Sequence, residues 1–223
     1  KDVNPFSLSR TQLLMKCTPS NRKLNAKSLK EAIEFLCKTD SDLNKIIRKR
    51  KKNINLFKRP SGFTGLINLI VEQQLSVISA KAIFERLEKS IVPFSAKKFL
   101  KTEKEVFKSA GLSPQKINYC QGIAKACLSN NINFYALEKM SNESVVEHLV
   151  RFKGIGEWTA QCYLLGCMSR LDAWPASDLG LQVAIQRIKG LEKRPKRLTT
   201  EKIAEPWKPF RSVAALILWS SYD

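Results

Sequence analysis

Two aspartates in one loop are the side chains of this sequence whose types and spacing most suggest chemistry. Asp172 and Asp178 flank a short segment that contains a proline, and an apolar, helix-like run begins at Leu179. An aspartate at the threshold of a helix usually caps it, because its carboxylate accepts hydrogen bonds from the amides of the first turn. Spacing alone therefore favours a cap at Asp178, and a catalytic carboxylate is the alternative.

A turn with two glycines is the second such feature. Gly154 and Gly156 join two apolar, periodic segments within residues 149–160. Because glycine has no Cβ, it permits positive φ and the close approach of a ligand, and the amides that begin the second helix point outward. A DNA phosphate suits such a site. By itself, however, a Gly-x-Gly pattern is more often an ordinary turn between helices.

The charge balance indicates a polyanionic partner. Lys and Arg number 39 against 20 Asp and Glu, and the formal net charge is +19. The field of such a molecule attracts nucleic acid, although an anionic membrane surface or simple solubility are alternatives. The basic runs at residues 48–52 and 193–197 either neutralise DNA phosphates or are solvated loops.

The cysteines and the single histidine argue against a metal site. The two-residue gap between paired cysteines that is typical of zinc sites is absent, and His148 is the only histidine. Several cysteines fall at core-like positions, where reduced thiols pack as small hydrophobic side chains. We therefore expect no transition metal, and buried thiols rather than disulfides, at Cys17, Cys37, Cys120, Cys127, Cys162 and Cys167.

The elements that must position these residues are predicted to be helices throughout. Strands with clean alternation are hard to find, and the pattern predicts an all-α fold of roughly ten helices joined by short polar turns. No Gly/Ser linker divides the chain, so residues 1–223 are expected to form a single unit. Apolar residues at helical spacing include Leu66, Leu69, Ile70, Val145, Val146, Leu149 and Val150.

Three signals predict where helices begin. Ser28 with Glu31, and Thr102 with Glu105, have the spacing of a capping box. The dipeptide Ser113-Pro114 offers an N-cap followed by a proline at the first helical position.

Nothing in the sequence indicates a membrane protein. No run approaches the roughly 18 apolar residues of a membrane span, and residues 1–16 lack the apolar run of a secretory signal. We expect an intracellular protein, in the cytoplasm or nucleoid of a bacterium or in the nucleus of a eukaryote.

Three segments carry a family pattern. They are residues 70–76, the stretch from Phe-x-Gly-Ile-Gly-x-Trp-Thr-Ala (residues 152–160) to Asp178, and residues 207–215. In order and spacing, over residues 28–223, they resemble the DNA-3-methyladenine glycosylase II family of the helix-hairpin-helix (HhH-GPD) superfamily. The resemblance implies a compact two-lobed helical fold with the active site in the cleft between the lobes.

The same resemblance implies the finer organisation. A helix-hairpin-helix is expected at about residues 143–168, and the N- and C-terminal helices are expected to share one lobe. The chain resembles the compact form of the family, since it has no room for the N-terminal β-rich domain of larger bacterial members.

By this resemblance Asp178 is the catalytic carboxylate, a role compatible with capping. Hydrolysis of an N-glycosidic bond passes through an oxocarbenium-like sugar, whose charge a fixed carboxylate stabilises while it orients or deprotonates the attacking water. A purine alkylated at N3 or N7 is cationic and already a good leaving group. The implied activity is excision of alkylated purines of the 3-methyladenine type. Asp172 matches the family's loop and is expected to be structural.

The resemblance also implies a wedge. An enzyme that reaches a base inside duplex DNA must rotate the nucleotide out and fill the gap. Gln74, together with Leu75, stands where the family's wedge is expected. The alternative is that Gln74 is only a polar residue at a helix end.

Aromatic residues are candidates for the base pocket, since their faces stack on an extruded base and attract its positive charge. Trp219 matches a pocket tryptophan of the family, and Trp158 and Tyr163 are secondary candidates. Core packing is the alternative for each. Cys162 stands where the better-studied bacterial form has a pocket tyrosine, a departure that leaves the base preference open.

The hairpin is expected to grip the DNA backbone. No cofactor is required, but by the resemblance the main-chain carbonyls of Val150, Phe152 and Ile155 are candidate ligands of Na+ or K+ that bridges to a phosphate. The backbone contacts are assigned to Lys153, Gly154, Ile155, Gly156 and Thr159.

Two departures from related branches indicate a glycosylase without lyase activity. Superfamily members that also cut the strand carry a lysine nucleophile two residues after the second glycine, where this chain has Trp158. Endonuclease-III-like relatives bear a four-cysteine iron–sulfur cluster near the C-terminus, and no cysteine follows Cys167.

Two rival functions remain from the sequence. One is a glycosylase for a neutral, oxidised or deaminated base that uses the same aspartate with a differently shaped pocket. The other is a noncatalytic helix-hairpin-helix DNA-binding module, in which Asp178 would be only a cap. In each case we expect a monomer whose partner is DNA, damaged duplex DNA for an enzyme, and not a membrane.

Overall fold

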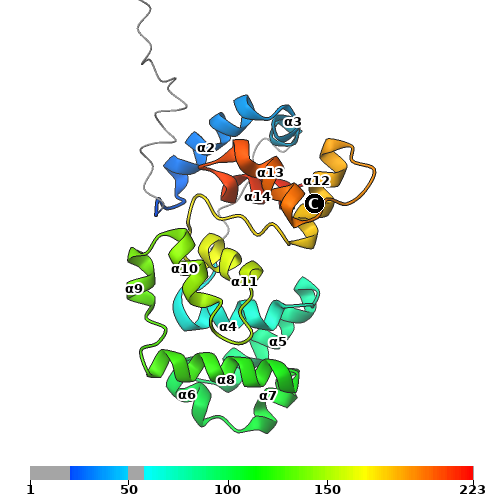
Figure 1. Cartoon of the computed structure of the whole chain (residues 1–223). Helices are drawn as coiled ribbons and strands as arrows, with labels where there is room; N and C mark the ends of the chain where they lie inside the picture. The colour runs from blue at the N-terminus through cyan, green and yellow to red at the C-terminus, as the bar shows by residue number, and fades with distance from the viewer. Residues whose placement is uncertain (1–20, 50–57, 223) are drawn as a thin grey trace, which may run out of the picture. The chain divides into compact units, whose positions relative to one another are not determined.

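The computed structural model describes residues 21–49 and 58–222, and the chain divides into two helical units (Figure 1). The first unit combines Lys1–Leu56 with Arg170–Asp223, and the second is Phe57–Ser169. Within the described ranges there is no strand, and an isolated bridge pairs Lys23 with Arg170. The predicted all-α fold is confirmed.

The first unit packs around its C-terminal helix. In α14 every side chain from 212 to 218 is buried, and α2, α3 and α12 all contact this helix. Aromatic pairs extend the core, with ring centroids 5.2 Å apart for Phe35 and Phe210 and 5.5 Å apart for Trp174 and Trp207. The helices are α2 (Ala26–Thr39), α3 (Ser41–Lys49), α12 (Leu179–Lys189), α13 (Arg197–Ala204), the 3₁₀ turn η2 (Glu205–Trp207) and α14 (Arg211–Ser220).

The second unit packs around α4, whose predicted apolar positions Leu66, Leu69 and Ile70 are buried. Helices α5, α8 and η1 contact it, and α8 also contacts α6 and α7 (Figure 1). The helices are α4 (Gly62–Glu72), α5 (Val77–Ser90), α6 (Ala96–Lys101), α7 (Lys104–Ala110), α8 (Pro114–Leu128), α9 (Phe134–Lys139), α10 (Asn142–Leu149), α11 (Glu157–Cys162) and the π-helical turn η1 (Tyr163–Cys167).

One of the predicted helix starts is confirmed and one is displaced. The Ser113 side chain caps α8, and Pro114 is the first residue of that helix. Ser28, in contrast, is the third residue of α2, and Asn25 is the N-cap. Asn25 and Ser28 exchange reciprocal side-chain to amide hydrogen bonds of 2.9 and 3.0 Å. The prediction was wrong by one turn, because asparagine caps a helix as well as serine does.

The predicted start at Thr102 is wrong. Thr102 follows the last residue of α6, and its hydroxyl donates back to the Lys98 carbonyl at 3.0 Å. Glu103 occupies the N-cap position of α7. The two short helices follow each other so closely that a threonine with the spacing of a start ends the preceding helix instead.

The cysteines of the described ranges are thiols packed into the helical core or at its edge. Burial raises the pKa of Cys120 to about 12, of Cys127 to about 11 and of Cys167 to about 12. These thiols are therefore protonated and weakly nucleophilic at neutral pH. Cys17 lies outside the described residues.

Among residues 21–49 and 58–222, no helix combines the length and the apolar character needed to cross a membrane.

Candidate functional site

Asp178 caps α12 and is held beside an aromatic ring. Its Oδ1 accepts a hydrogen bond from the Leu181 amide at 2.8 Å. The same oxygen accepts one from the indole N–H of Trp219, on α14, at 3.0 Å. Two donors on one oxygen fix the orientation of the carboxylate, and the side chain is only partly buried. The structure thus brings together two of the predicted site residues, Asp178 and Trp219.

Gly180 makes this close approach possible. A Cβ at this position would lie 3.1 Å from Oδ1 of Asp178 and 3.5 Å from Cδ1 and Nε1 of Trp219. A side chain would crowd the carboxylate and the indole that it accepts from. The second residue of α12 is therefore small for a reason that concerns the site.

Tyr222 and Arg187 complete the surroundings of Asp178 and were missed from the sequence. The Tyr222 hydroxyl donates to the Gly180 carbonyl at 2.6 Å, and Cζ of Arg187 lies 5.2 Å from the centre of its ring. Burial raises the pKa of Tyr222, the Arg187 guanidinium opposes that rise, and the Asp178 carboxylate adds to it. Tyr222 lies three residues after Trp219, in the turn that follows α14, and this short separation could have identified it.

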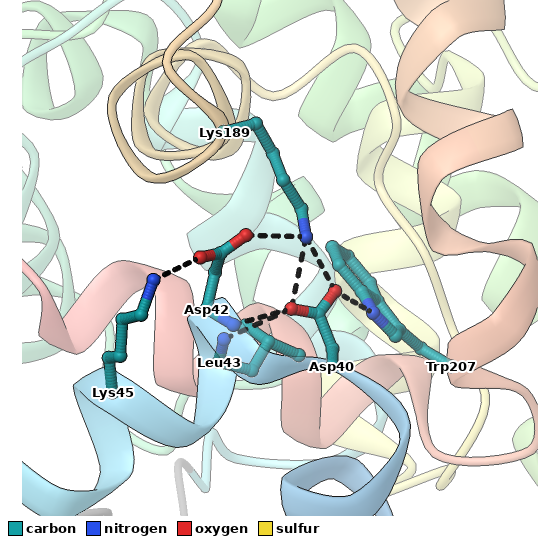
Figure 2. Close-up of polar contacts among 6 residues, drawn as sticks. All are labelled: Asp40, Asp42, Leu43, Lys45, Lys189 and Trp207. Atoms are coloured by element: carbon teal, nitrogen blue, oxygen red, sulfur yellow. Dashed lines mark hydrogen bonds and ion pairs between the residues drawn. The ribbon is translucent and has the colours of Figure 1, made fainter.

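A polar network anchors the other end of α12 (Figure 2). Nζ of Lys189, the last residue of the helix, lies 3.0 and 2.8 Å from the two carboxylate oxygens of Asp40 and 3.0 Å from Oδ2 of Asp42. The indole of Trp207 donates to Oδ2 of Asp40 at 2.9 Å. The helix that Asp178 caps is therefore fixed at its start by Trp219 and at its end by Lys189.

The two central charges of this network stabilise each other. Burial by itself would raise the pKa of Asp40, but the hydrogen bonds from Lys189, Trp207 and the Leu43 amide outweigh it and lower the pKa. Burial would lower the pKa of Lys189, whereas its bonds to Asp40 and Asp42 raise it overall. The ion pair is intact throughout the neutral range.

Asp172 has structural partners. Its carboxylate accepts hydrogen bonds from Nε and Nη2 of Arg211 at 2.8 and 2.7 Å and from the Arg211 amide at 3.2 Å. These bonds tie the loop before α12 to the start of α14, as the structural role expected for Asp172 requires.

The hairpin between α10 and α11 belongs to the second unit (Figure 1). Gly154 has a φ of 94°, and a Cβ there would lie 2.4 Å from Cγ of Tyr119 on α8. Conformation and close contact both require glycine. Gly156 caps α11 with a φ of −92°, is exposed, and has open space around its Cβ position. The first amides of α11 thus follow an uncrowded stretch of backbone.

The other hairpin candidates differ in exposure. Lys153 is exposed, whereas Ile155 and Thr159 are buried. The Thr159 hydroxyl accepts a hydrogen bond from Nε2 of Gln73 at 3.0 Å, so this side chain has a partner inside the unit. The carbonyl of Phe152 accepts the Ile155 amide at 3.0 Å, and a carbonyl oxygen has a second lone pair for a cation.

The connection between α4 and α5, residues 73–76, carries the predicted wedge and is named the tip below. Gln74 is a non-glycine residue with a φ of 57°. The next residue, Leu75, is 41% exposed. A left-handed conformation is uncommon for a residue with a side chain, and here it accompanies the tight turn between α4 and α5.

The remaining base-pocket candidates, Trp158, Cys162 and Tyr163, lie in the second unit. Trp158 is partly buried and Cys162 is buried. Tyr163 is 2% exposed, its hydroxyl accepts the Gly62 amide at 3.1 Å, and its ring centroid is 6.2 Å from that of Phe134. Burial raises the pKa of Tyr163. These contacts give Tyr163 a packing role within its unit.

The basic runs lie at exposed positions where they are described. Lys193 and Arg194 belong to the loop between α12 and α13, and both are exposed. Arg48 and Lys49 end α3, and the following Arg50, Lys51 and Lys52 lie outside the described residues.

Nowhere in the described ranges do three or more His, Cys, Asp or Glu side chains gather as a metal ion would require.

Comparison with known proteins identifies related sequences. A family model described as "HhH-GPD superfamily base excision DNA repair protein" matches residues 67–209. The alkylbase DNA glycosidase-like protein mag2 of Schizosaccharomyces pombe is 31% identical over 163 residues, which are 70% of this chain and 76% of that protein. DNA-3-methyladenine glycosylase 1 of the same organism is 32% identical over 184 residues, 80% of either chain.

Solved structures resemble the chain over most of its length. The 3-methyladenine DNA glycosylase Mag1 of S. pombe, in complex with abasic DNA, matches with a TM-score of 0.80 and 30% identity over 86% of this chain and 96% of that one. A DNA-3-methyladenine glycosidase from Bacillus halodurans matches with a TM-score of 0.73 and 29% identity, over 85% and 88% of the two chains.

Proposed function

Because this chain belongs to the HhH-GPD superfamily of base excision DNA repair proteins, we propose that it is a monofunctional DNA glycosylase that excises alkylated purines. The observation that carries the proposal is the pairing of Asp178 with Trp219 at the start of α12. The proposed reaction is hydrolysis of the N-glycosidic bond of a 3-methyladenine-type lesion, with water as the nucleophile.

Asp178 supplies the negative charge that the reaction needs. As the purine leaves, positive charge develops on the sugar, and a carboxylate held in place stabilises it without having to reorganise. The two hydrogen bonds to Oδ1 hold the carboxylate in one orientation at the start of α12. The same carboxylate orients or deprotonates the water that attacks the anomeric carbon.

Trp219 has two proposed roles, one toward Asp178 and one toward the base. Its indole N–H holds Oδ1, which sets the direction of the carboxylate. Its electron-rich ring attracts a cationic base such as an N3- or N7-alkylated purine, a contact worth roughly 0.5 to 2 kcal/mol. An already cationic base needs little protonation to leave, so this pair suffices without a dedicated general acid.

The hairpin supplies the grip on the DNA backbone. The amides that follow Gly156 and the exposed Lys153 suit a phosphate. The carbonyls of Val150, Phe152 and Ile155 are of the type that holds Na+ or K+, which would add positive charge beside that phosphate. The proposed partner is damaged duplex DNA, bound by a monomer, in the compartment of the cell that holds the DNA.

Trp158 argues for hydrolysis without strand cleavage. A Schiff base with the sugar needs a lysine amine, and the position that carries this lysine in bifunctional superfamily members is a tryptophan here. The abasic site is the proposed end product.

A lesion panel tests the proposal. Duplex oligonucleotides with N3-methyladenine, N7-methylguanine, 1,N6-ethenoadenine, hypoxanthine or 8-oxoguanine are incubated with the protein, and released bases are measured. Release of the methylated purines, with no adduct trapped by borohydride, is expected. Release of only neutral bases would replace the proposed substrate class, and DNA binding without any release would leave a noncatalytic binding module.

A further inference from the structure

The tip between α4 and α5 is held from two sides inside the second unit. Nζ of Lys116, on α8, donates to the carbonyls of Val71 and Gln73, each at 2.7 Å. These carbonyls belong to the end of α4, where helix carbonyls lack partners within the helix. Burial lowers the pKa of Lys116, but the amine still ties the end of α4 to α8.

The second side is the hairpin. Nε2 of Gln73 donates to the Gly154 carbonyl at 2.8 Å and to the Thr159 hydroxyl at 3.0 Å. A primary amide has two hydrogens to donate, and here both hold hairpin atoms. Gln73 therefore connects the tip to the segment that we propose grips the DNA backbone.

Helix α8 joins the two sides. Lys116 holds the tip, and Tyr119, one turn further along α8, lies against Gly154 so closely that a Cβ there would overlap its ring. The end of α4 has an additional anchor, since Nη2 of Arg59 lies 2.7 Å from Oε2 of Glu72. Hydrogen bonds and packing thus join the tip, α8 and the hairpin into one group.

Exposed apolar side chains lie at the tip and at the start of α5. Leu75 is 41% exposed, and Val77 and Ile78 at the start of α5 are 84% and 83% exposed. Surface of this kind is costly in water and favourable against the faces of unstacked bases. Gln74, in its left-handed conformation, lies in the sequence between Gln73, which bonds to the hairpin, and the exposed Leu75.

We propose that Gln73 and Lys116 are positioning residues that hold Gln74 at a fixed offset from the hairpin, so that a phosphate gripped by the hairpin determines where Gln74 enters the base stack. The inference rests on the proposed glycosylase function and adds to it the part of the chain that makes the wedge stiff. Opening the stack costs free energy, because stacking and pairing are lost. If the tip moved when Gln74 entered the stack, the protein would bind DNA without extruding the nucleotide.

The test removes the hydrogen bonds and the charge of Lys116 and keeps most of its length. Lys116→Met is compared with Lys125→Met, which removes an equal charge from an exposed position further along α8. Each protein excises N7-methylguanine in single turnover from a fully paired duplex and from a single-nucleotide bulge, where the lesion is unpaired and costs less to extrude. Melting temperatures establish that both variants are folded.

We expect Lys116→Met to lose at least about tenfold in rate on the paired duplex and less than about threefold on the bulge. Lys125→Met keeps the wild-type rates on both. Gln73→Leu removes the hydrogen bonds from the Gln73 amide to the Gly154 carbonyl and the Thr159 hydroxyl. It should reproduce the selective loss even if Lys116→Met does not fold. Equal losses on both substrates, or no loss on either, would overturn the proposal.

A readout without excision separates this inference from the proposed function. The fluorescence of 2-aminopurine beside a tetrahydrofuran abasic analogue rises when a protein opens the stack. We expect wild type and Lys125→Met to raise it at saturation, and Lys116→Met to bind without raising it. If wild type opens the stack but excises nothing, the proposed activity fails and the positioning role stands. If Lys116→Met opens the stack as wild type does, the positioning role fails.

Discussion

A single indole nitrogen ties the carboxylate of Asp178 to the helix that forms the core of its unit. The donor is Trp219, whose ring is also proposed to meet the base. The cap at Asp178 could be predicted from the sequence, because Asp is a preferred N-cap residue and Asp178 directly precedes an apolar helix. The contact with Trp219 could not, because 41 residues separate the two side chains.

Trp219→Phe tests the contribution of the indole N–H. An aromatic ring is kept, although it is smaller than the indole, and the hydrogen bond of 3.0 Å to Oδ1 is lost. A hydrogen bond to a charged group contributes about 1.5 to 3 kcal/mol, so the single-turnover rate should fall roughly 10- to 100-fold. DNA affinity should change little.

Tyr222→Phe is the matched control for this change. It removes a hydroxyl bond to the Gly180 carbonyl and leaves the Asp178 hydrogen bonds in place. A loss in Tyr222→Phe as large as in Trp219→Phe would mean that general packing around α12, and not the indole N–H, sets the rate.

The hairpin glycines make a second test at the residue scale. Gly154→Ala introduces a Cβ 2.4 Å from the Tyr119 ring at a φ of 94°, and strain of this kind costs about 1 to 3 kcal/mol. Thermal unfolding should show a lower melting temperature, with weaker DNA binding. Gly156→Ala, at a φ of −92° with open space, should melt close to wild type. Similar melting of the two variants would contradict the account of Gly154.

At the scale of elements, one of the three predicted helix starts was correct and two were displaced. Ser113 begins α8 as predicted, whereas the capping pattern at Thr102 falls in the short gap between α6 and α7. The anchor at the end of α12 had no sequence signal, because Lys189 meets Asp40 across 149 residues. Contacts at such separation depend on the fold and cannot be read from spacing.

Lys189→Met should destabilise the protein in a pH-dependent manner. It removes one partner of a pair in which Asp40 is 9% exposed, and the cost near neutral pH is about 2 kcal/mol. Because the folded pKa of Asp40 lies below 3.8, its contribution is present above that pH and is lost as pH falls through the folded value. The raised pKa of Lys189 keeps its own contribution in place up to at least pH 10.5.

Urea unfolding of wild type and Lys189→Met between pH 2.5 and 9 checks this prediction. The difference in unfolding free energy should be largest from about pH 5 to 9 and should shrink toward the acid end. A difference of the same size at every pH would show that the ion pair is not its source.

At the scale of the whole molecule, the charge of +19 makes DNA affinity depend on salt. Each phosphate contact changes the slope of log K against log salt by about 0.9. Composition therefore predicted the class of partner, whereas it contained no information on the lesion. That information depends on pocket geometry, which a charge count does not contain.

The exposed loop between α12 and α13 is expected to contribute to this slope. The double variant Lys193→Gln/Arg194→Gln should lower its magnitude by about 2, equally for damaged and undamaged duplex. Fluorescence anisotropy over a salt series measures it. The double variant Lys97→Gln/Lys101→Gln on α6 removes the same charge and should leave the slope near wild type; equal slopes in both variants would exclude specific phosphate contacts by the loop.

The central claim is that the carboxylate of Asp178 carries the chemistry, and single-turnover excision of N7-methylguanine by Asp178→Asn tests it most directly. Asparagine caps helices as well as aspartate does, so the fold and the DNA affinity should persist while the charge is gone. We predict a loss of at least about a hundredfold in excision rate with unchanged binding. An Asp178→Asn protein that excises the base at close to the wild-type rate would contradict the account.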